Sequence, residues 1–255
     1  MIKHWIAAIL LTLATLTLQA QQTQVQYLSG HGVDDPVEWD FYCTAGRNSG
    51  YWTKINVPSN WEPQGFGSFN FGRDANKADE QGLYKTTFQV PAQWRNQRIF
   101  IVFEGSMTDT EVKINGRSAG PVHQGGYYRF KREITSLVRF NRDNLLEVNV
   151  SKVSANESVE AAERYADYWV FGGIFRPVYL EAVPQNHIEY TAIDAKMDGS
   201  ITTEINLQDP LKQFEVEMTV SDLDGRVLGI FSGSHSGTAE KRLTINGKVN
   251  GVKPW

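Results

Sequence analysis

Cysteine is almost absent from the 255-residue chain, which has a single one at position 43. An intrachain disulfide is therefore excluded, and Cys43 is expected to be a small buried hydrophobic residue. The five histidines are scattered and the spacing H-E-x-x-H does not occur, so no catalytic metal site is indicated. The formal net charge of -4 gives no reason to expect nucleic acid or an anionic membrane as a partner.

Long apolar runs are also missing, except at the N-terminus. A basic start precedes an apolar run over residues 5–18, and the small residue Ala20 follows. This pattern is typical of a secretory signal peptide, residues 1–20, that is cleaved after Ala20. The alternative is an uncleaved membrane anchor, for which the run is short. We expect a mature protein that begins near Gln21, is periplasmic or secreted, and has no contact with the membrane after cleavage.

Helical periodicity is lacking as well, and only short helical turns are expected, near 92–96, 134–138 and 157–163. Strand signals are strong instead, because short apolar or alternating runs recur roughly every ten residues with turn residues between them. These runs cover 52–57, 84–90, 98–103, 110–114, 144–150 and 178–182. The pattern predicts an all-β fold in which residues 21–184 form a first β-sandwich domain.

A second series of strands begins after Pro184, which marks the expected domain boundary. The predicted strands cover 187–193, 200–207, 214–221, 226–231 and 239–245. Hairpin-type turns at Asp224-Gly225 and Asn246-Gly247 support an Ig-like β-sandwich over residues 185–255. Its last strands are missing from the pattern, so we expect a truncated domain. The alternative is a naturally short chain end.

Two irregular stretches stand out between the predicted strands. Residues 62–82 form a long loop, and a loop of this length in a compact domain is usually functional or disordered. Its three phenylalanines favour order. Residues 161–181 start polar, become aromatic, and turn through Gly172-Gly173, where glycine permits a bend that a side chain would block. A rigid loop here would aim Asp167 at a ligand.

Seven segments follow one another between residues 50 and 185. They are Pro58-Ser-Asn-Trp61, Gly82-Leu-Tyr84, Phe103-Glu-Gly105, Val112-Lys-Ile-Asn-Gly116, Gly125-Gly-Tyr127, Asn144-x-Leu-x-Val148 and Asp167-x-Trp169-x-x-Gly-Gly-Ile-Phe-Arg176. In this order they resemble glycoside hydrolase family 2, in particular its secreted β-galactosidase-like members. The resemblance implies a galactose-binding-like jelly roll, then the Ig-like domain, and in the family a TIM barrel with two catalytic glutamates. No barrel pattern occurs here, and Asn156-Glu157 is no substitute for the family's catalytic Asn-Glu motif because it lies inside the first domain. No catalytic residue is therefore expected in this chain.

The resemblance implies substrate-binding roles for three residues. Asp167 matches an aspartate that in galactosidase-like relatives binds sugar hydroxyls and, in some members, a sodium ion. No cofactor is expected, and a sodium or other cation near Asp167 is expected only with the barrel present. Asn70 corresponds to a sugar-contacting asparagine, although its loop departs from the family pattern. Trp169 stacks on a sugar ring or, as is commoner for such a residue, lies in the core. The alternative for Asp167 is an ion pair with Arg164.

Other notable residues are expected to be structural. Arg176 should clamp a carboxylate or backbone carbonyls. His123 should be a strand histidine whose hydrogen bonds are satisfied. The adjacent pair Gly125-Gly126 predicts a turn and not a phosphate-binding loop, because no helix follows.

The predicted function is the non-catalytic N-terminal region of a secreted family 2 glycoside hydrolase. It would shape a site for a terminal β-linked sugar and support a catalytic barrel in cis or in trans. The alternatives are a stand-alone carbohydrate-binding module and a structural subunit that complements a separate catalytic barrel.

Overall fold

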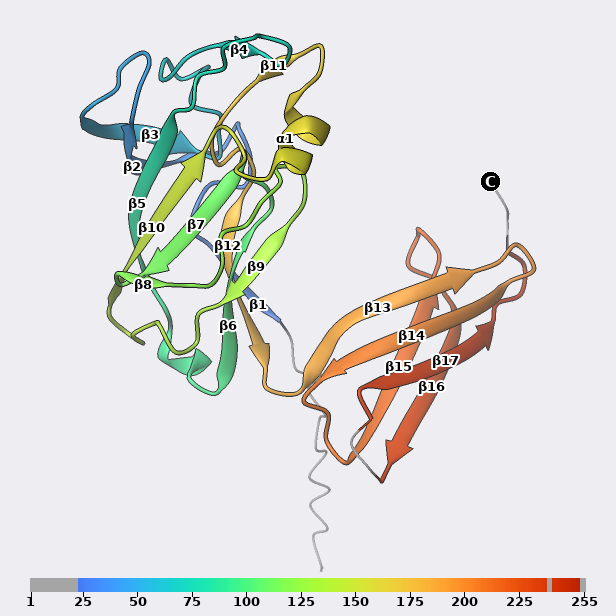
Figure 1. Cartoon of the computed structure of the whole chain (residues 1–255). Coiled ribbons are helices and arrows are strands. Elements are labelled where there is room, and N and C mark those ends of the chain that lie inside the picture. Colours follow the sequence, from blue (N-terminus) through green and yellow to red (C-terminus); the bar gives the residue numbers. More distant parts are fainter. Residues whose placement is uncertain (1–22, 238–239, 253–255) are drawn as a thin grey trace, which may run out of the picture.

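The computed structural model of the chain describes residues 23–237 and 240–252. The predicted signal peptide lies outside the described residues. The chain folds into two β-sandwiches joined end to end, and α1 is the single α-helix among the described residues (Figure 1). The prediction of an all-β fold is therefore confirmed. No helix in the described part of the chain has the length and apolar character needed to cross a membrane.

The first sandwich consists of two antiparallel sheets with a short strand pair at one end. Its strands are β1 (Gln24–Tyr27), β2 (Val37–Cys43), β3 (Trp52–Val57), β4 (Asn70–Phe71), β5 (Gln81–Gln89), β6 (Gln97–Phe103), β7 (Asp109–Ile114), β8 (Arg117–Ser118), β9 (Phe130–Glu133), β10 (Asp143–Ser151), β11 (Trp169–Val170) and β12 (Val178–Pro184). One sheet has the order β1-β12-β6-β9, the other β3-β2-β5-β10-β7-β8, and β11 pairs with β4. The helical turn η1 (Ala92–Trp94) and the helix α1 (Glu157–Arg164) complete the domain.

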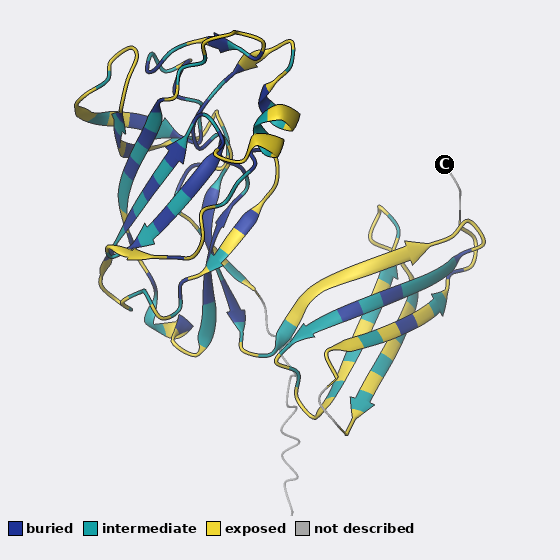
Figure 2. Cartoon of the chain, viewed as in Figure 1, coloured by how far each residue is buried: buried dark blue, intermediate teal, exposed yellow. Residues whose placement is uncertain are grey.

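The alternation of apolar residues in the sequence determines which side chains enter the core. Along β10, Leu146, Val148 and Val150 are buried, while the residues between them are only partly covered (Figure 2). The continuous apolar run of β6 is buried on both faces of its sheet. Ile101 belongs to the main core, whereas Val102 belongs to a smaller cluster on the outer face. Period-two alternation therefore describes β10 but not β6.

The second sandwich is smaller and has few buried side chains. Its strands are β13 (His187–Ala195), β14 (Ser200–Gln208), β15 (Gln213–Ser221), β16 (Val227–Ser236) and β17 (Arg242–Lys248), in sheets ordered β13-β14-β17 and β15-β16. Among its described residues, the buried hydrophobic side chains are Ile205, Ile245 and Val249. Its outer strand β13 leaves Ile193 63% exposed. The core of this part is therefore thin.

The two sandwiches meet at a short junction. β12 ends at Pro184 and β13 begins at His187. The side-chain amide of Asn186 donates to the carbonyl of Asp209, and Arg98 Nη1 lies 3.6 Å from Asp209 Oδ2. Both contacts are made to Asp209, the residue that follows β14.

Candidate functional site

The two irregular stretches of the sequence meet at one end of the first sandwich, where β4, β11 and α1 lie (Figure 1). β4 pairs antiparallel with β11, and Phe71 lies opposite Trp169. The Gly72 N–H extends this pairing by donating to the carbonyl of Tyr168 at 2.8 Å. The long loop therefore supports the segment that carries Asp167.

An exposed cluster of aromatic side chains covers this strand pair. The Trp169 ring meets Phe71 and Phe69 edge-to-face, with ring centroids 5.4 and 5.9 Å apart. Phe69 also meets Phe171 edge-to-face at 6.0 Å. Trp169 is 53% exposed and Phe69 is 46% exposed. The core position considered for Trp169 is therefore wrong. Together with Asp167, these four aromatic residues are called the rim below.

Asp167 is exposed and has no hydrogen bond or ion pair with any described residue. The alternative pairing with Arg164 is wrong, because Arg164 is 2% exposed and its guanidinium is used elsewhere. It donates to the carbonyls of Lys152 and Phe171 at 3.1 and 2.6 Å. A carboxylate only accepts hydrogen bonds, so Asp167 is suited to groups that donate, such as sugar hydroxyls.

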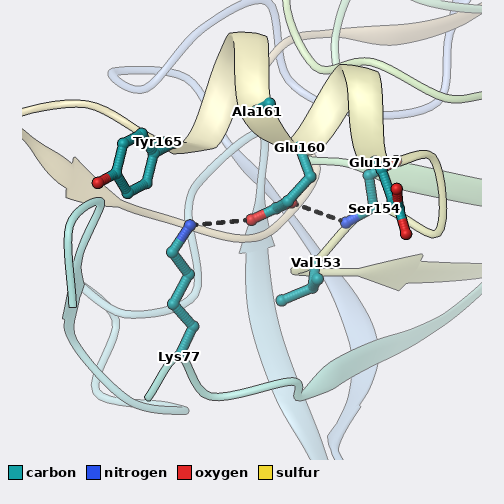
Figure 3. A pocket seen from close by; sticks show the side chains of 7 residues that line it. All are labelled: Lys77, Val153, Ser154, Glu157, Glu160, Ala161 and Tyr165. Carbon is teal, nitrogen blue, oxygen red and sulfur yellow. Dashed lines mark hydrogen bonds and ion pairs between the residues drawn. The ribbon is translucent and has the colours of Figure 1, made fainter. Parts of the chain in front are cut away.

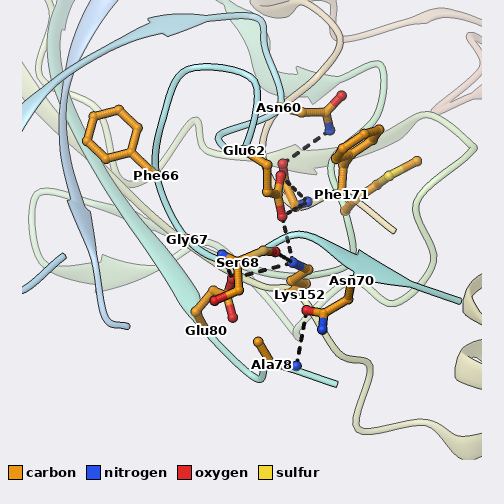
Figure 4. Close-up of polar contacts among 12 residues, drawn as sticks. Asn60, Glu62, Phe66, Gly67, Ser68, Asn70, Ala78, Glu80, Lys152 and Phe171 are labelled. Carbon is orange, nitrogen blue, oxygen red and sulfur yellow. Dashed lines mark hydrogen bonds and ion pairs between the residues drawn. The ribbon is translucent and has the colours of Figure 1, made fainter. Parts of the chain in front are cut away.

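Asn70 lies behind the rim and not on its surface. The residue is 9% exposed, and its side-chain oxygen accepts a hydrogen bond from the Ala78 N–H at 3.2 Å (Figure 4). This bond closes the long loop on itself. In this structure Asn70 therefore braces the loop, and its amide oxygen is already occupied.

A buried polar cluster lies beneath the rim (Figure 4). Glu62, Glu80 and Lys152 are at most 2% exposed. Lys152 Nζ lies 2.8 Å from Glu62 Oε1 and 3.4 Å from Glu80 Oε1, and it donates to the Ser68 carbonyl. Burial raises the pKa of Glu62, and the charge of Lys152 partly offsets that rise. Sequence reasoning missed this cluster, since isolated charged residues in loops usually face solvent.

The buried cluster holds the glycine corner that follows the rim segment. The Gly172 N–H donates to both carboxylate oxygens of Glu62, at 3.0 and 3.1 Å. The Asn60 side chain donates to the Gly172 carbonyl at 3.1 Å. A Cβ at position 172 would lie 2.0 Å from Trp61 Cζ2, so only glycine fits. The segment that carries the rim is therefore held rigidly from below.

A pocket of about 420 Å³ opens beside α1, the helix that leads into the rim segment (Figure 3). Its lining residues are Lys77, Val153, Ser154, Glu157, Glu160, Ala161 and Tyr165. Lys77 Nζ lies 3.1 Å from Glu160 Oε1 and donates to the Arg164 carbonyl at 3.2 Å. The Tyr165 ring is 64% exposed. The pocket thus offers an aromatic face beside the ion pair of Lys77 and Glu160.

The remaining expectations are mostly confirmed. Arg176 Nη1 donates to the Tyr127 carbonyl at 3.1 Å, which is the predicted clamp on a carbonyl. Cys43 is fully buried. His123 stacks on Phe130, with ring centroids 3.9 Å apart, but its Nε2 is buried without a hydrogen-bond partner in the described chain. The expectation of a fully satisfied histidine is therefore wrong, and burial lowers the pKa of His123.

Exposed aromatic rings and a carboxylate that pairs with no described residue, at one end of the sandwich, suit a ligand that has both apolar faces and hydroxyl donors, such as a sugar. Residues 48–184 match the family model described as "Glycosyl hydrolases family 2, sugar binding domain". The chain belongs to this family, as its sequence motifs predicted.

Similar proteins agree with this assignment. A β-galactosidase of Thermoanaerobacter pseudethanolicus is 33% identical over 129 residues, which are 48% of this chain and 17% of that protein. A putative β-glucuronidase of Formosa agariphila is 28% identical over 141 residues, 55% of this chain and 16% of that protein. A crystal structure of Bacteroides uniformis β-glucuronidase has the same fold, with a TM-score of 0.68 and 21% identity, covering 92% of this chain and 29% of that one. The chain thus spans less than a third of each of these relatives.

Proposed function

We propose that this chain is the non-catalytic N-terminal region of a secreted, β-galactosidase-like glycoside hydrolase that cleaves O-glycosyl bonds. Its rim forms one wall of the sugar site, and a catalytic barrel in cis or in trans supplies the reacting carboxylates. Asp167 accepts hydrogen bonds from hydroxyls of a terminal β-linked sugar. Trp169 offers an aromatic face to the ring of that sugar.

One observation carries this proposal: Asp167 is an exposed carboxylate without a partner among the described residues, on a segment that is fastened from below. The Gly172 N–H is bound to the buried Glu62, and Arg164 is bound to the Phe171 carbonyl. Hydrogen-bonding groups contribute most to recognition when supporting residues fix them in place before the ligand arrives. A carboxylate that only faced solvent would not need a segment that is held in place from below.

The test is Asp167→Asn in the chain together with its catalytic barrel. The variant keeps the shape but loses the charge and one acceptor. Hydrogen bonds to charged groups contribute roughly 1.5–3 kcal/mol, which corresponds to a fall in kcat/KM of about tenfold to more than a hundredfold. The melting temperature should stay unchanged. A kcat/KM within about threefold of the wild type would contradict the assignment of Asp167.

The matched control for this test is Asp224→Asn. Asp224 is exposed at the turn between β15 and β16, in the second sandwich. Its replacement removes the same charge in the other sandwich, away from the rim. We expect wild-type kinetics for this variant, so a general effect of net charge would be recognised.

The non-catalytic part of the proposal has its own test. We expect no turnover of aryl β-galactosides or β-glucuronides by the purified chain, because retaining hydrolysis needs two carboxyl groups about 5–5.5 Å apart across the bond. The close carboxylates Glu62 and Glu80 are buried and bound to Lys152. Turnover clearly above a mock preparation would contradict this expectation.

Secretion is a separate proposal that depends on residues 1–20. Mass spectrometry of the protein exported from the native host should give a mature N-terminus near Gln21. Recovery of the chain with its first twenty residues, in the membrane fraction, would favour the anchor instead.

A further inference from the structure

The outer face of the six-stranded sheet carries a row of charged side chains that alternates in sign. Opposite positions on neighbouring strands place Lys54 beside Asp40, Asp40 beside Lys85, Lys85 beside Glu147, and Glu147 beside Lys113. The row therefore runs from β3 to β7 as plus, minus, plus, minus, plus. Lys54 Nζ lies 2.7 Å from Asp40 Oδ1, and Lys85 Nζ lies 3.4 Å from Glu147 Oε1.

A second row runs beside it on the same face, because residues two apart on a strand point the same way. Its members, in the order of the strands, are Trp52, Tyr42, Leu83, Asn149 and Glu111. Trp52 is 47% exposed, its ring centroid lies 5.7 Å from that of Tyr42, and Lys85 Nζ lies 4.7 Å from the indole centre. A groove of about 260 Å³ is lined by Trp52, Lys85, Glu147, Asn149 and other residues of the two rows.

Asn149 leaves an acceptor unused in this groove. Its side-chain nitrogen donates to Gln81 Oε1 at 3.1 Å. Its side-chain oxygen is buried and has no donor among the described residues. A buried acceptor without a partner costs free energy, so such atoms are rare in folded proteins. Because this oxygen is buried, a ligand hydroxyl would supply the missing donor only once the Asn149 side chain turns toward the groove that it lines.

We propose that this groove is a second carbohydrate site, separate from the rim, which binds a neutral oligosaccharide. A hydroxyl both donates and accepts hydrogen bonds, and the groove offers ammonium donors beside carboxylate and amide acceptors. The lining contains two lysines and two glutamates, so its formal charges sum to zero. A polyanion would therefore lie against Glu111 and Glu147 and gain no net electrostatic attraction. The exposed part of the Trp52 indole, beside Lys85, provides an apolar surface for a sugar ring.

The dimensions of the sheet favour an oligosaccharide over a single sugar. Strands in a sheet are about 4.8 Å apart, so the row from β3 to β7 extends about 19 Å. Sheet stability alone does not explain the arrangement. Exposed ion pairs contribute little to stability, and neither the exposure of Trp52 nor the unused acceptor of Asn149 is needed for them.

The site does not rest on the proposed function, because it needs neither the barrel nor Asp167. The test is isothermal titration calorimetry of the chain with cellohexaose, β-1,4-galactohexaose and β-1,4-mannohexaose. We expect saturable binding of at least one hexaose with Kd below about 5 mM. Trp52→Ala and Asn149→Ala should each weaken it about tenfold or more, with unchanged melting temperatures.

A control variant and a comparison with the rim make the outcome decisive. Tyr51→Ala removes a neighbouring aromatic ring that is 52% exposed and does not line the groove, and it should bind as the wild type does. Trp169→Ala removes the rim tryptophan, so it tests whether the hexaose binds at the rim instead. The proposal is overturned if no hexaose binds, if Trp52→Ala binds normally, or if Trp169→Ala abolishes binding, which would place the sugar on the rim. A protein partner on this face would give the first of these results.

Discussion

Among the described residues, Lys152 is the single cation in contact with two buried carboxylates, those of Glu62 and Glu80. Replacing it with methionine keeps the volume but leaves both acids without their partner. Removing one member of a buried ion pair typically costs about 3–5 kcal/mol. We therefore expect Lys152→Met to lower the free energy of unfolding of the chain by about this amount, as measured by urea denaturation.

A surface pair provides the matched control. Lys54 Nζ lies 2.7 Å from Asp40, and both side chains are more than half exposed. Lys54→Met should change the free energy of unfolding by less than about 1 kcal/mol. Equal effects of the two substitutions would show that the buried cluster has no special role in stability.

His123 makes stability depend on pH. Burial lowers the pKa of His123 from its usual 6.5, so the folded state favours the neutral ring. The stabilisation is fully present above pH 6.5 and is lost as the pH falls through the lowered pKa of the folded state. Urea denaturation at pH 7.5 and pH 5 should show this loss in the wild type. It should be smaller in His123→Leu, whereas His31→Leu, at an exposed histidine, should retain it.

At the scale of elements, sequence patterns predicted the strands well where apolar residues alternate, as in β5, β7 and β10. They also singled out both halves of the rim. The pairing of β4 with β11 was not predictable, because strands of two residues have no periodicity. The core position expected for Trp169 was wrong because Trp61, which is fully buried, already fills the space beneath the glycine corner. Only the tertiary packing reveals that competition.

Gly72 allows β4 to approach the segment that carries Asp167. A Cβ at position 72 would lie 2.3 Å from the Ala166 carbonyl oxygen, so Gly72→Ala must push the two segments apart. Overpacking of this kind costs about 1–3 kcal/mol. Hydrogen exchange by mass spectrometry should show faster exchange in residues 163–171. Gly32→Ala is the control, since a Cβ there meets nothing within 4 Å; equal exchange patterns would contradict the expectation.

On the scale of the whole molecule, the domain boundary at Pro184 stays a prediction that proteolysis can test. The first sandwich has a continuous core, while the polar contacts described at the junction involve Arg98, Asn186 and Asp209. We expect residues 21–184 to fold alone and limited proteolysis to leave a fragment that ends near Pro184. If both parts of the chain are degraded at the same rate, the first sandwich is not independently stable.

The place of β12 in its sheet affects how the protein is made. β12 is the last strand of the first sandwich in the chain, yet it lies between β1, the first strand, and β6. While the chain is being synthesised, β1 has no partner in that sheet, and β6 keeps an open edge, until β12 has left the ribosome. Unpaired edges of this kind favour aggregation. The four-stranded sheet of the first sandwich can therefore be completed only after residues 178–184 have been synthesised.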